Sequence, residues 1–287
     1  MQSLREILVA ADSDHIAIGH FNFSEMVAFN AIVAGAKSLG VAVMAGVSEG
    51  ERELVGVKQA AAMVRAAREK SGLPIFLNAD HTHSIEKAEE AARAGFDEVI
   101  FDGSNKPLEQ NIAETRRAVE SLKSINPSIL IEGEVGYIGT SSEILEKAPE
   151  GMSLTTPDEA RQFVAETRVD ILAPAVGNMH GMLASMVRGE GGKHLDIDRI
   201  AAIKQAIKIP MTLHGGSGTV DDDFRSAIKA GMTIVHVNTE LRLAWRHSLE
   251  ESLRAHPNEV APYKILAPVV DEVRKVVEKR LRLFNAR

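Results

Sequence analysis

The stretch PIFLNADHTHSIEKAEEAARAGFDEVIFDGS, residues 74–104, decides the fold because it contains a strand–helix–strand unit. Its two ends, residues 74–80 and 98–104, are short apolar runs typical of buried strands, and the segment between them has the spacing of an amphipathic helix. Gly95 follows that segment, where a glycine commonly ends a helix. We therefore predict two parallel strands joined by a helix.

The same alternation of strand and helix continues along the chain. Gly40 and Gly231 close helical segments as Gly95 does. Strand-like runs occur at residues 16–22, 41–48, 74–80, 98–104, 129–136, 171–178, 210–216 and 233–239. Eight such units predict an α/β fold, a (β/α)₈ TIM barrel, with a doubly wound open sheet as the alternative.

We expect residues 1–287 to form a single domain, because no linker or low-complexity segment divides the chain. The longest irregular stretch, residues 137–157, follows the fifth strand, and a loop of that length is usually functional, often as a lid. Residues 267–284 predict an extra C-terminal amphipathic helix that closes the barrel or meets another subunit.

Composition excludes several classes of protein. The net charge of -7 argues against a nucleic-acid partner, because the basic footprint of such proteins is missing. No apolar run approaches the ~18 residues of a membrane span, and the first residues do not resemble a signal peptide, so we expect a cytoplasmic protein with no membrane partner. Without cysteine, any metal must be held by His, Asp or Glu.

Polar residues gather at the C-terminal ends of the strand-like runs. They are Asn22, Ser48, Asp80, His81, Asp102, Ser104, Glu134, Asn178, His180, His214, His236, Asn238 and Thr239. In a barrel these ends converge on one face, where active sites lie, whereas an open sheet spreads them along an edge. This convergence favours the barrel.

Three histidines lie within a residue or two of a predicted strand end: His81, His180 and His214, with the carboxylate of Glu134 on a strand between them. One such histidine is as often structural as functional, but three favour a metal site. Three protein ligands with an open position are typical of catalytic Zn²⁺, and Mn²⁺, Co²⁺ or Fe²⁺ are the alternatives. His20, inside the first run, is expected to be a satisfied core residue.

Asp80 directly precedes His81. Neighbouring side chains near a strand end diverge, so we do not expect both on one metal ion. A carboxylate beside a metal suits proton transfer with a substrate hydroxyl. Orientation of a ligand histidine is an equally good explanation.

The glycine-rich sequence LHGGSG, residues 213–218, follows the seventh strand, and HVNTE follows the eighth. The loops after these two strands are the recurrent phosphate site of TIM barrels. A turn without a ligand is the alternative. The glycines would point N–H groups at an anion, and side chains would add contacts. The residues concerned are Gly215, Gly216, Ser217, Gly218, Asn238 and Thr239.

Several segments resemble the class II, metal-dependent fructose-bisphosphate and tagatose-bisphosphate aldolases over nearly the full length of the chain. They are GHFNFSEMVAFNAIVAGA, DGSNKPLEQNIAETRRAVE, EGMSLTTPDEARQFVAET, AVGNMHG and LHGGSG. The resemblance implies a (β/α)₈ barrel, a homodimer or homotetramer, and Zn²⁺. It also implies a phosphorylated sugar as partner, cleaved reversibly from a ketose 1,6-bisphosphate to dihydroxyacetone phosphate and an aldehyde.

The resemblance also implies roles for single residues. His81, His180 and His214 resemble the zinc ligands, and Glu134 resembles the carboxylate near an alternative metal position. Asp80 resembles the acid/base that acts on the C4 hydroxyl.

Further residues resemble the family's substrate site. Glu143 aligns weakly with the glutamate that removes the substrate's α proton. Gly181, Gly215, Ser217, Asn238 and Thr239 resemble the dihydroxyacetone phosphate site. The metal would act as a Lewis acid, and the absence of lysine from the predicted strands argues against a Schiff base.

Three positions depart from the family pattern: Asn78, His236 and Tyr263. His236 replaces an asparagine that contacts the bound ketone, so we expect it in the substrate site, with a fourth metal ligand or an added acid/base as further possibilities. Tyr263 replaces an arginine that reaches the second phosphate. Our hypothesis is that the acceptor aldehyde is not the usual triose phosphate, or that its phosphate is bound elsewhere.

Two other functions are compatible with the pattern. A metal-dependent sugar-phosphate epimerase or isomerase would use the same chemistry without cleaving a carbon–carbon bond. A non-catalytic partner subunit would keep the barrel alone, although retention of Asp80 and the three histidines argues against it.

Overall fold

The computed structural model describes residues 2–139 and 143–286, and within them eight parallel strands close into a barrel. The barrel strands are β1 (Ile18–Asn22), β2 (Val43–Val47), β3 (Ile75–Thr82), β4 (Glu98–Phe101), β5 (Leu130–Val135), β7 (Ile171–Pro174), β9 (Met211–Leu213) and β10 (Met232–His236). β10 pairs with β1, which closes the sheet. The predicted barrel is confirmed and the open sheet is excluded.

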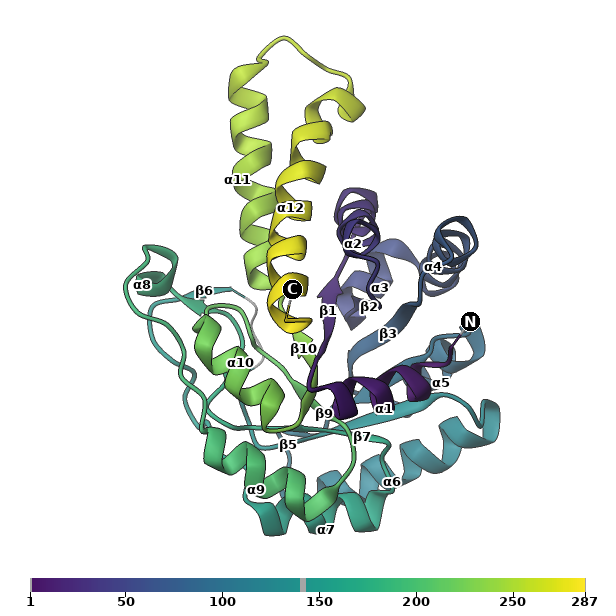
Figure 1. Cartoon of the computed structure of the whole chain (residues 1–287). Helices are drawn as coiled ribbons and strands as arrows, with labels where there is room; N and C mark the ends of the chain where they lie inside the picture. Colours follow the sequence, from purple (N-terminus) through teal and green to yellow (C-terminus); the bar gives the residue numbers. More distant parts are fainter. Residues whose placement is uncertain (1, 140–142, 287) are drawn as a thin grey trace.

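Helices surround the barrel and join its strands (Figure 1). They are α1 (Leu4–Asp14), α2 (Met26–Leu39), α3 (Glu49–Val55), α4 (Val57–Ser71), α5 (Ile85–Ala94), α6 (Leu108–Ile125), α7 (Pro157–Thr167), α8 (Ala184–Val187), α9 (Ile197–Ile207), α10 (Asp221–Lys229), α11 (Thr239–Ala255) and α12 (Pro262–Phe284). Outside the barrel, β6 (Ile144–Leu145) pairs with β8 (Met182–Leu183). Part of the stretch 137–157 is therefore ordered against the loop after β7.

Local sequence signals account for the helix boundaries of the β3–α5–β4 unit. The side chain of Ser84 accepts a hydrogen bond from the backbone N–H of Lys87 and so caps the first turn of α5. Gly95 ends the helix in the left-handed conformation, as Gly40 does for α2. Gly231 lies one residue beyond the C-cap of α10, with φ 118°.

The barrel interior changes from apolar to polar along the strands. Near the N-terminal ends of the strands, α1 packs against Ile18, Phe76 and Leu130, which form one buried cluster with it. Side chains two positions further along a strand face the same way. On β1 and β5 these next side chains are His20 and Glu132, which are fully buried. On these two strands, polar groups therefore follow the apolar layer toward the C-terminal ends, and on β4 a buried carboxylate, Glu98, already stands at the first position.

The extra C-terminal helix is present and packs along α2. A Cβ on Gly35 of α2 would come within 2.7 Å of Val277, so the two helices lie in close contact. The carbonyl of Phe284 accepts a hydrogen bond from Ala17, just before β1. α11 and the first half of α12 project from the barrel as an antiparallel pair (Figure 1). Among the described residues, no helix combines the length and apolar character of a membrane span.

Candidate active site

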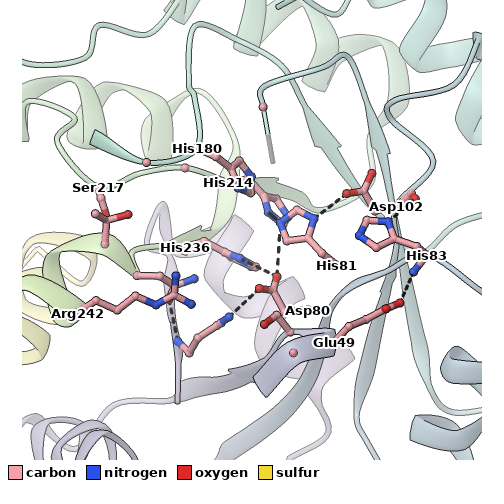
Figure 2. Close-up of a pocket in the computed structure, with 18 residues that line it drawn as sticks. Glu49, Asp80, His81, His83, Asp102, His180, His214, Ser217, His236 and Arg242 are labelled. Atoms are coloured by element: carbon pink, nitrogen blue, oxygen red, sulfur yellow. Dashed lines mark hydrogen bonds and ion pairs between the residues drawn. The ribbon is translucent and has the colours of Figure 1, made fainter. Parts of the chain in front are cut away.

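A cavity of about 300 Å³ opens at the C-terminal ends of the barrel strands. Its lining residues are Asn22, Ser48, Glu49, Gly50, Asp80, His81, His83, Asp102, Gly139, His180, Gly181, His214, Gly215, Ser217, His236, Asn238, Thr239 and Arg242. Figure 2 shows Ser217 and Arg242 on one side of a cluster of imidazoles, and Asp102, His83 and Glu49 on the other.

His81, His180 and His214 meet at the centre of this cavity. They come from the end of β3, the loop after β7 and the residue after β9. One ring nitrogen from each lies within 4.8 Å of the others. The ring centroid of His81 is 4.7 Å from that of His180 and 4.7 Å from that of His214, and the other two centroids are 6.0 Å apart.

Carboxylates fix the orientation of two of these rings. Asp102 lies 2.8 Å from Nδ1 of His81, and Glu132 lies 2.7 Å from Nε2 of His214. The opposite nitrogens, Nε2 of His81 and Nδ1 of His214, face each other at 3.2 Å. Carboxylate partners of this kind are typical of metal-ligating histidines.

The geometry of the three rings fits one divalent ion. Two nitrogens bound to zinc at tetrahedral angles lie about 3.3 Å apart, close to the observed His81–His214 spacing. Nε2 of His180 is buried and has no hydrogen-bond partner among the described residues, as a ligand nitrogen requires.

The charges around the rings give them different protonation behaviour. Burial lowers the pKa of His180, and the neighbouring His81 lowers it further. Burial also lowers the pKa of His214. The pKa of His81 is raised well above its usual value, because the carboxylates of Asp80 and Asp102 outweigh the effect of burial. A proton therefore competes with a metal ion mainly at His81.

Asp80 and His81 share the cavity although they are neighbours in sequence, which corrects the expectation that their side chains diverge. The backbone of His81 is left-handed, with φ 36°, and the pairing of β3 with β4 shifts register between Ala79 and Thr82. This bulge turns both side chains to one face, and Asp80 Oδ1 lies 3.8 Å from His81 Nε2.

The carboxylate of Asp80 is held from one side and open on the other. Asn22 Nδ2 donates to Asp80 Oδ2 at 2.7 Å and to Glu51 Oε2 at 2.8 Å. Arg242 in turn donates to Glu51 Oε1 at 2.7 Å. Asp80 Oδ1 has no hydrogen-bond partner among the described residues and lies 3.7 Å from His236 Nδ1. It is therefore free to exchange a proton with a bound hydroxyl.

His20 is buried but unsatisfied, which corrects the expectation of a satisfied core residue. Neither of its ring nitrogens has a hydrogen-bond partner among the described residues, and its ring packs on His236 with centroids 3.5 Å apart. His20, Asp80 and His236 thus form a second group of potential ligands. The His20 and His236 rings lie closer together than any two rings of the three-histidine group, and this contact is one of packing.

The glycine loop after β9 is shaped by its close approach to the loop after β7. Gly215 has φ 58°, and a Cβ there would come within 2.3 Å of the Met179 carbonyl. Gly216 does not line the cavity: its N–H donates to the carbonyl of His236 at 3.0 Å. Gly218 donates its N–H to Glu240. The expectation that Gly216 and Gly218 present N–H groups to an anion is therefore not met.

Other groups do face a possible anion. No hydrogen bond within residues 2–139 and 143–286 uses the N–H of Gly181, Gly215 or Ser217, all of which line the cavity. Thr239, also in the lining, begins α11, and a helix N-terminus favours negative charge. Asn238 lies beside it, with its Oδ1 accepting from the N–H of Asn22.

Glu134 lies beside the three histidines rather than among them. Its Oε2 is 3.5 Å from His81 Nδ1, and together with Asp102 these residues form another group of potential ligands. Burial raises the pKa of Glu134 to about 8, with a further contribution from Asp102.

Two predicted residues lie outside the cavity. Glu143 is exposed and does not line it, although its carbonyl accepts a hydrogen bond from Met182. The neighbouring part of the loop, residues 140–142, lies outside the described residues. Tyr263 is 74% exposed on the projecting part of α12.

Sequence reasoning missed three contributors. Glu132 orients His214, and its position two residues before Glu134 already places both side chains on one face of β5. Asp102 was recognised only as a polar strand end. Lys193 lies in a loop without any distinctive pattern, and its side chain reaches the carbonyls beside His180 and His214.

Comparisons with known proteins agree with this geometry. The family model described as "Fructose-bisphosphate aldolase class-II" matches residues 2–287. The 6-phospho-5-dehydro-2-deoxy-D-gluconate aldolase of Shouchella clausii is 34% identical over 283 residues, 98% of this chain and 93% of that protein. The probable fructose-bisphosphate aldolase of Bacillus subtilis is 32% identical over 287 residues, 99% of this chain and 97% of that protein.

Solved structures show the same fold. The YdjI aldolase from Escherichia coli K12 superimposes with a TM-score of 0.82 at 24% identity, covering 99% of this chain and 97% of that one. A putative fructose-1,6-biphosphate aldolase from Coccidioides immitis gives 0.83 at 26% identity, covering 99% and 96%. The chain therefore belongs to the class II fructose-bisphosphate aldolase family, whose enzymes are lyases.

Proposed function

We propose that this protein is a zinc-dependent aldolase that cleaves a ketose phosphate between C3 and C4 to dihydroxyacetone phosphate and an aldehyde. The observation that carries the proposal is the convergence of three imidazoles beside the open carboxylate oxygen of Asp80. These groups come from β3 and from the loops after β7 and β9, so we also propose that residues 1–287 work as one domain.

The metal would be held by His81 Nε2, His180 Nε2 and His214 Nδ1. When bound, it supplies a Lewis acid that draws electron density from the ketone and stabilises the negative charge that develops during cleavage. Zinc is proposed because three neutral nitrogens and an open position match its catalytic sites.

Asp80 is proposed to take the proton from the C4 hydroxyl. As the O–H bond breaks, C4 becomes the aldehyde carbonyl and the C3–C4 electron pair stays with the donor fragment. A proton must then be added at C3, and Glu143, on the loop after β5, is proposed to deliver it. Asn22 keeps Asp80 in place throughout, since it binds the oxygen that does not exchange the proton.

The phosphate next to the ketone is proposed to accept hydrogen bonds from the N–H groups of Gly181, Gly215 and Ser217. It would lie near the N-terminus of α11. Asn238 and Thr239 would complete this site, and His236 would contact the substrate between the phosphate and Asp80. Convergent backbone N–H groups and a helix N-terminus are both typical of anion-binding sites.

The far end of the substrate is proposed to lack a second phosphate. Among the described lining residues the one arginine, Arg242, lies on the Ser217 side of the cavity and is paired with Glu51 (Figure 2). No lysine is in the described lining, and Tyr263 is exposed away from it. The names of the two relatives indicate substrates with one and with two phosphates.

Steady-state assays can test this assignment. A reductase that consumes triose phosphate would follow cleavage of ketose 1-phosphates and of the 1,6-bisphosphates. We expect triose phosphate from both, with the higher kcat/KM on a substrate phosphorylated at one end. A strong preference for the bisphosphate contradicts the proposed far end. Interconversion of ketose phosphates without any triose phosphate would instead identify an epimerase or isomerase.

The location and the assembly remain predictions. A cytoplasmic protein and a homodimer or homotetramer are expected from the sequence and from the family resemblance. Complete absence of turnover on any phosphorylated ketose, with metal bound, would favour the non-catalytic subunit.

A further inference from the structure

Lys193 is buried at the back of the glycine loop, with 4% of its surface exposed. It lies between α8 and α9, and its Nζ donates to three backbone carbonyls. The acceptors are Met179 at 2.7 Å, Gly181 at 2.7 Å and Gly215 at 2.8 Å. All three hydrogens of the ammonium group are therefore used.

These carbonyls belong to the residues that flank two of the proposed metal ligands. Met179 and Gly181 lie on either side of His180, and Gly215 directly follows His214. One ammonium group thus joins the loop after β7 to the loop after β9, at the point where each loop carries an imidazole.

The same peptide groups are also fixed at their N–H ends. The N–H after the Met179 carbonyl donates to Ile138, and the N–H after the Gly215 carbonyl donates to His236. With both ends bonded, these peptide planes cannot rotate without breaking a buried hydrogen bond. The orientation of the peptides sets the direction of the neighbouring imidazoles.

The main chain of Lys193 is anchored to the far end of the glycine loop. Its N–H donates to Gly218 at 2.8 Å, and its carbonyl accepts from Val220 at 3.3 Å. Lys193 therefore contacts the loop after β9 through both its main chain and its side chain, and it contacts the loop after β7 through its side chain.

In the part of the chain that the structure describes, no carboxylate lies within ion-pair distance of the ammonium group of Lys193. Burial lowers the pKa of Lys193 to about 7, with Glu240 opposing the shift. Three carbonyls at hydrogen-bond distance require three N–H groups, which only the ammonium form provides. Since Lys193 does not line the cavity, it is not placed to react with a substrate.

We propose that Lys193 is a positioning residue, an internal cation that holds the loops after β7 and β9 at the spacing where His180 and His214 face one metal ion. It also holds the carbonyls of Gly181 and Gly215, the two residues whose own N–H groups, in the preceding peptides, face the phosphate. This inference rests on the proposed function, because it assigns no chemistry of its own to Lys193.

The test compares Lys193→Met with Lys229→Met, which removes an exposed lysine on α10. Two affinities are measured on the folded full-length chain: that for Zn²⁺, by chelator competition, and that for inorganic phosphate, by calorimetry. We expect Lys193→Met to weaken zinc binding by about tenfold or more, the usual effect of losing groups that orient a metal ligand. Phosphate binding should weaken as well, and Lys229→Met should leave both unchanged.

A second variant covers the case in which Lys193→Met does not fold. Lys193→Ala is purified in ammonium chloride and then dialysed into tetramethylammonium chloride, and bound zinc is measured in each. The proposal requires zinc retention in ammonium, whose ion can occupy the carbonyl ring, and loss in tetramethylammonium, whose ion is too large and has no N–H group.

Folded Lys193→Met that binds zinc and phosphate within twofold of the wild type overturns the inference, and so does equal zinc retention by Lys193→Ala in both salts. Failure of the wild-type protein to bind zinc overturns the proposed function instead.

Discussion

His81 is the residue on which the site depends most directly. Its left-handed backbone, with φ 36°, is unfavourable for a residue with a Cβ, and such conformations persist where the surrounding structure enforces them. Here the hydrogen bond to Asp102 and the bulge in β3 do so. The strain brings a carboxylate and an imidazole, adjacent in sequence, into one cavity.

Asp80 gives the clearest prediction at the scale of a residue. Asp80→Asn keeps the size of the side chain but removes the group that accepts a proton, so turnover should fall about 10²–10⁴-fold. Zinc content should stay at the wild-type level, because none of the three proposed ligands is altered. Asp222→Asn, at an acid that is 92% exposed, is the matched control and should be fully active. Unchanged turnover in Asp80→Asn would refute the proposed role.

The sequence predicted some residues of the site far better than others. His81, His180 and His214 could be placed because each lies near the C-terminal end of an apolar run, where a barrel brings side chains together. The roles of Asp102 and Lys193 could not be predicted. The first depends on an irregular register between β3 and β4, and the second on the path of a loop without periodicity.

At the scale of elements, the site depends on how closely the loops after β7 and β9 approach each other. Gly215 allows that approach, since any Cβ would overlap the Met179 carbonyl. Gly40 has nearly the same φ, 61° against 58°, but a Cβ there would meet nothing within 4 Å. Substitutions at these two positions can therefore separate the free-energy cost of a left-handed backbone from the cost of steric overlap.

Alanine at these two positions should have different effects. Gly40→Ala should lower the free energy of unfolding by about 1 kcal/mol, the cost of a left-handed alanine. Gly215→Ala should lower it by about 2–4 kcal/mol, because the loop must also move. It should weaken phosphate binding too, which Gly40→Ala should not. Urea denaturation and calorimetry measure both effects, and equal losses in the two variants would show that close approach is unimportant.

Element boundaries were predicted best where glycine marks them. Gly95 ends α5 and Gly40 ends α2, as predicted. The pairing of β6 with β8 was not predictable, because two residues on each side carry no periodicity and their partners come from separate loops.

At the scale of the whole molecule, the barrel explains why one end is stable and the other reactive. α1 and an apolar layer that includes Ile18, Phe76 and Leu130 close the barrel near the N-terminal ends of the strands, while buried polar groups such as His20 and Glu132 follow further along. Buried charges and unsatisfied nitrogens at the C-terminal ends of the strands are costly for folding unless a ligand satisfies them. The closed barrel concentrates them in one cavity, which an open sheet would not do.

The barrel itself was predictable because eight units repeat the same pattern, so a misplaced boundary in one unit does not change the count. The projection of α11 and α12 beyond the barrel (Figure 1) was not, since an amphipathic pattern does not distinguish a helix packed on its own chain from one that extends past it.

The most direct test of the account is the position of a bound metal ion. Anomalous diffraction at the zinc edge, from crystals of the full-length protein grown with zinc, locates the ion independently of any assumed ligands. We predict one strong peak at about 2.0–2.1 Å from His81 Nε2, His180 Nε2 and His214 Nδ1. A peak bound by fewer than two of these nitrogens, or no peak at the cavity in zinc-saturated protein, would contradict the account.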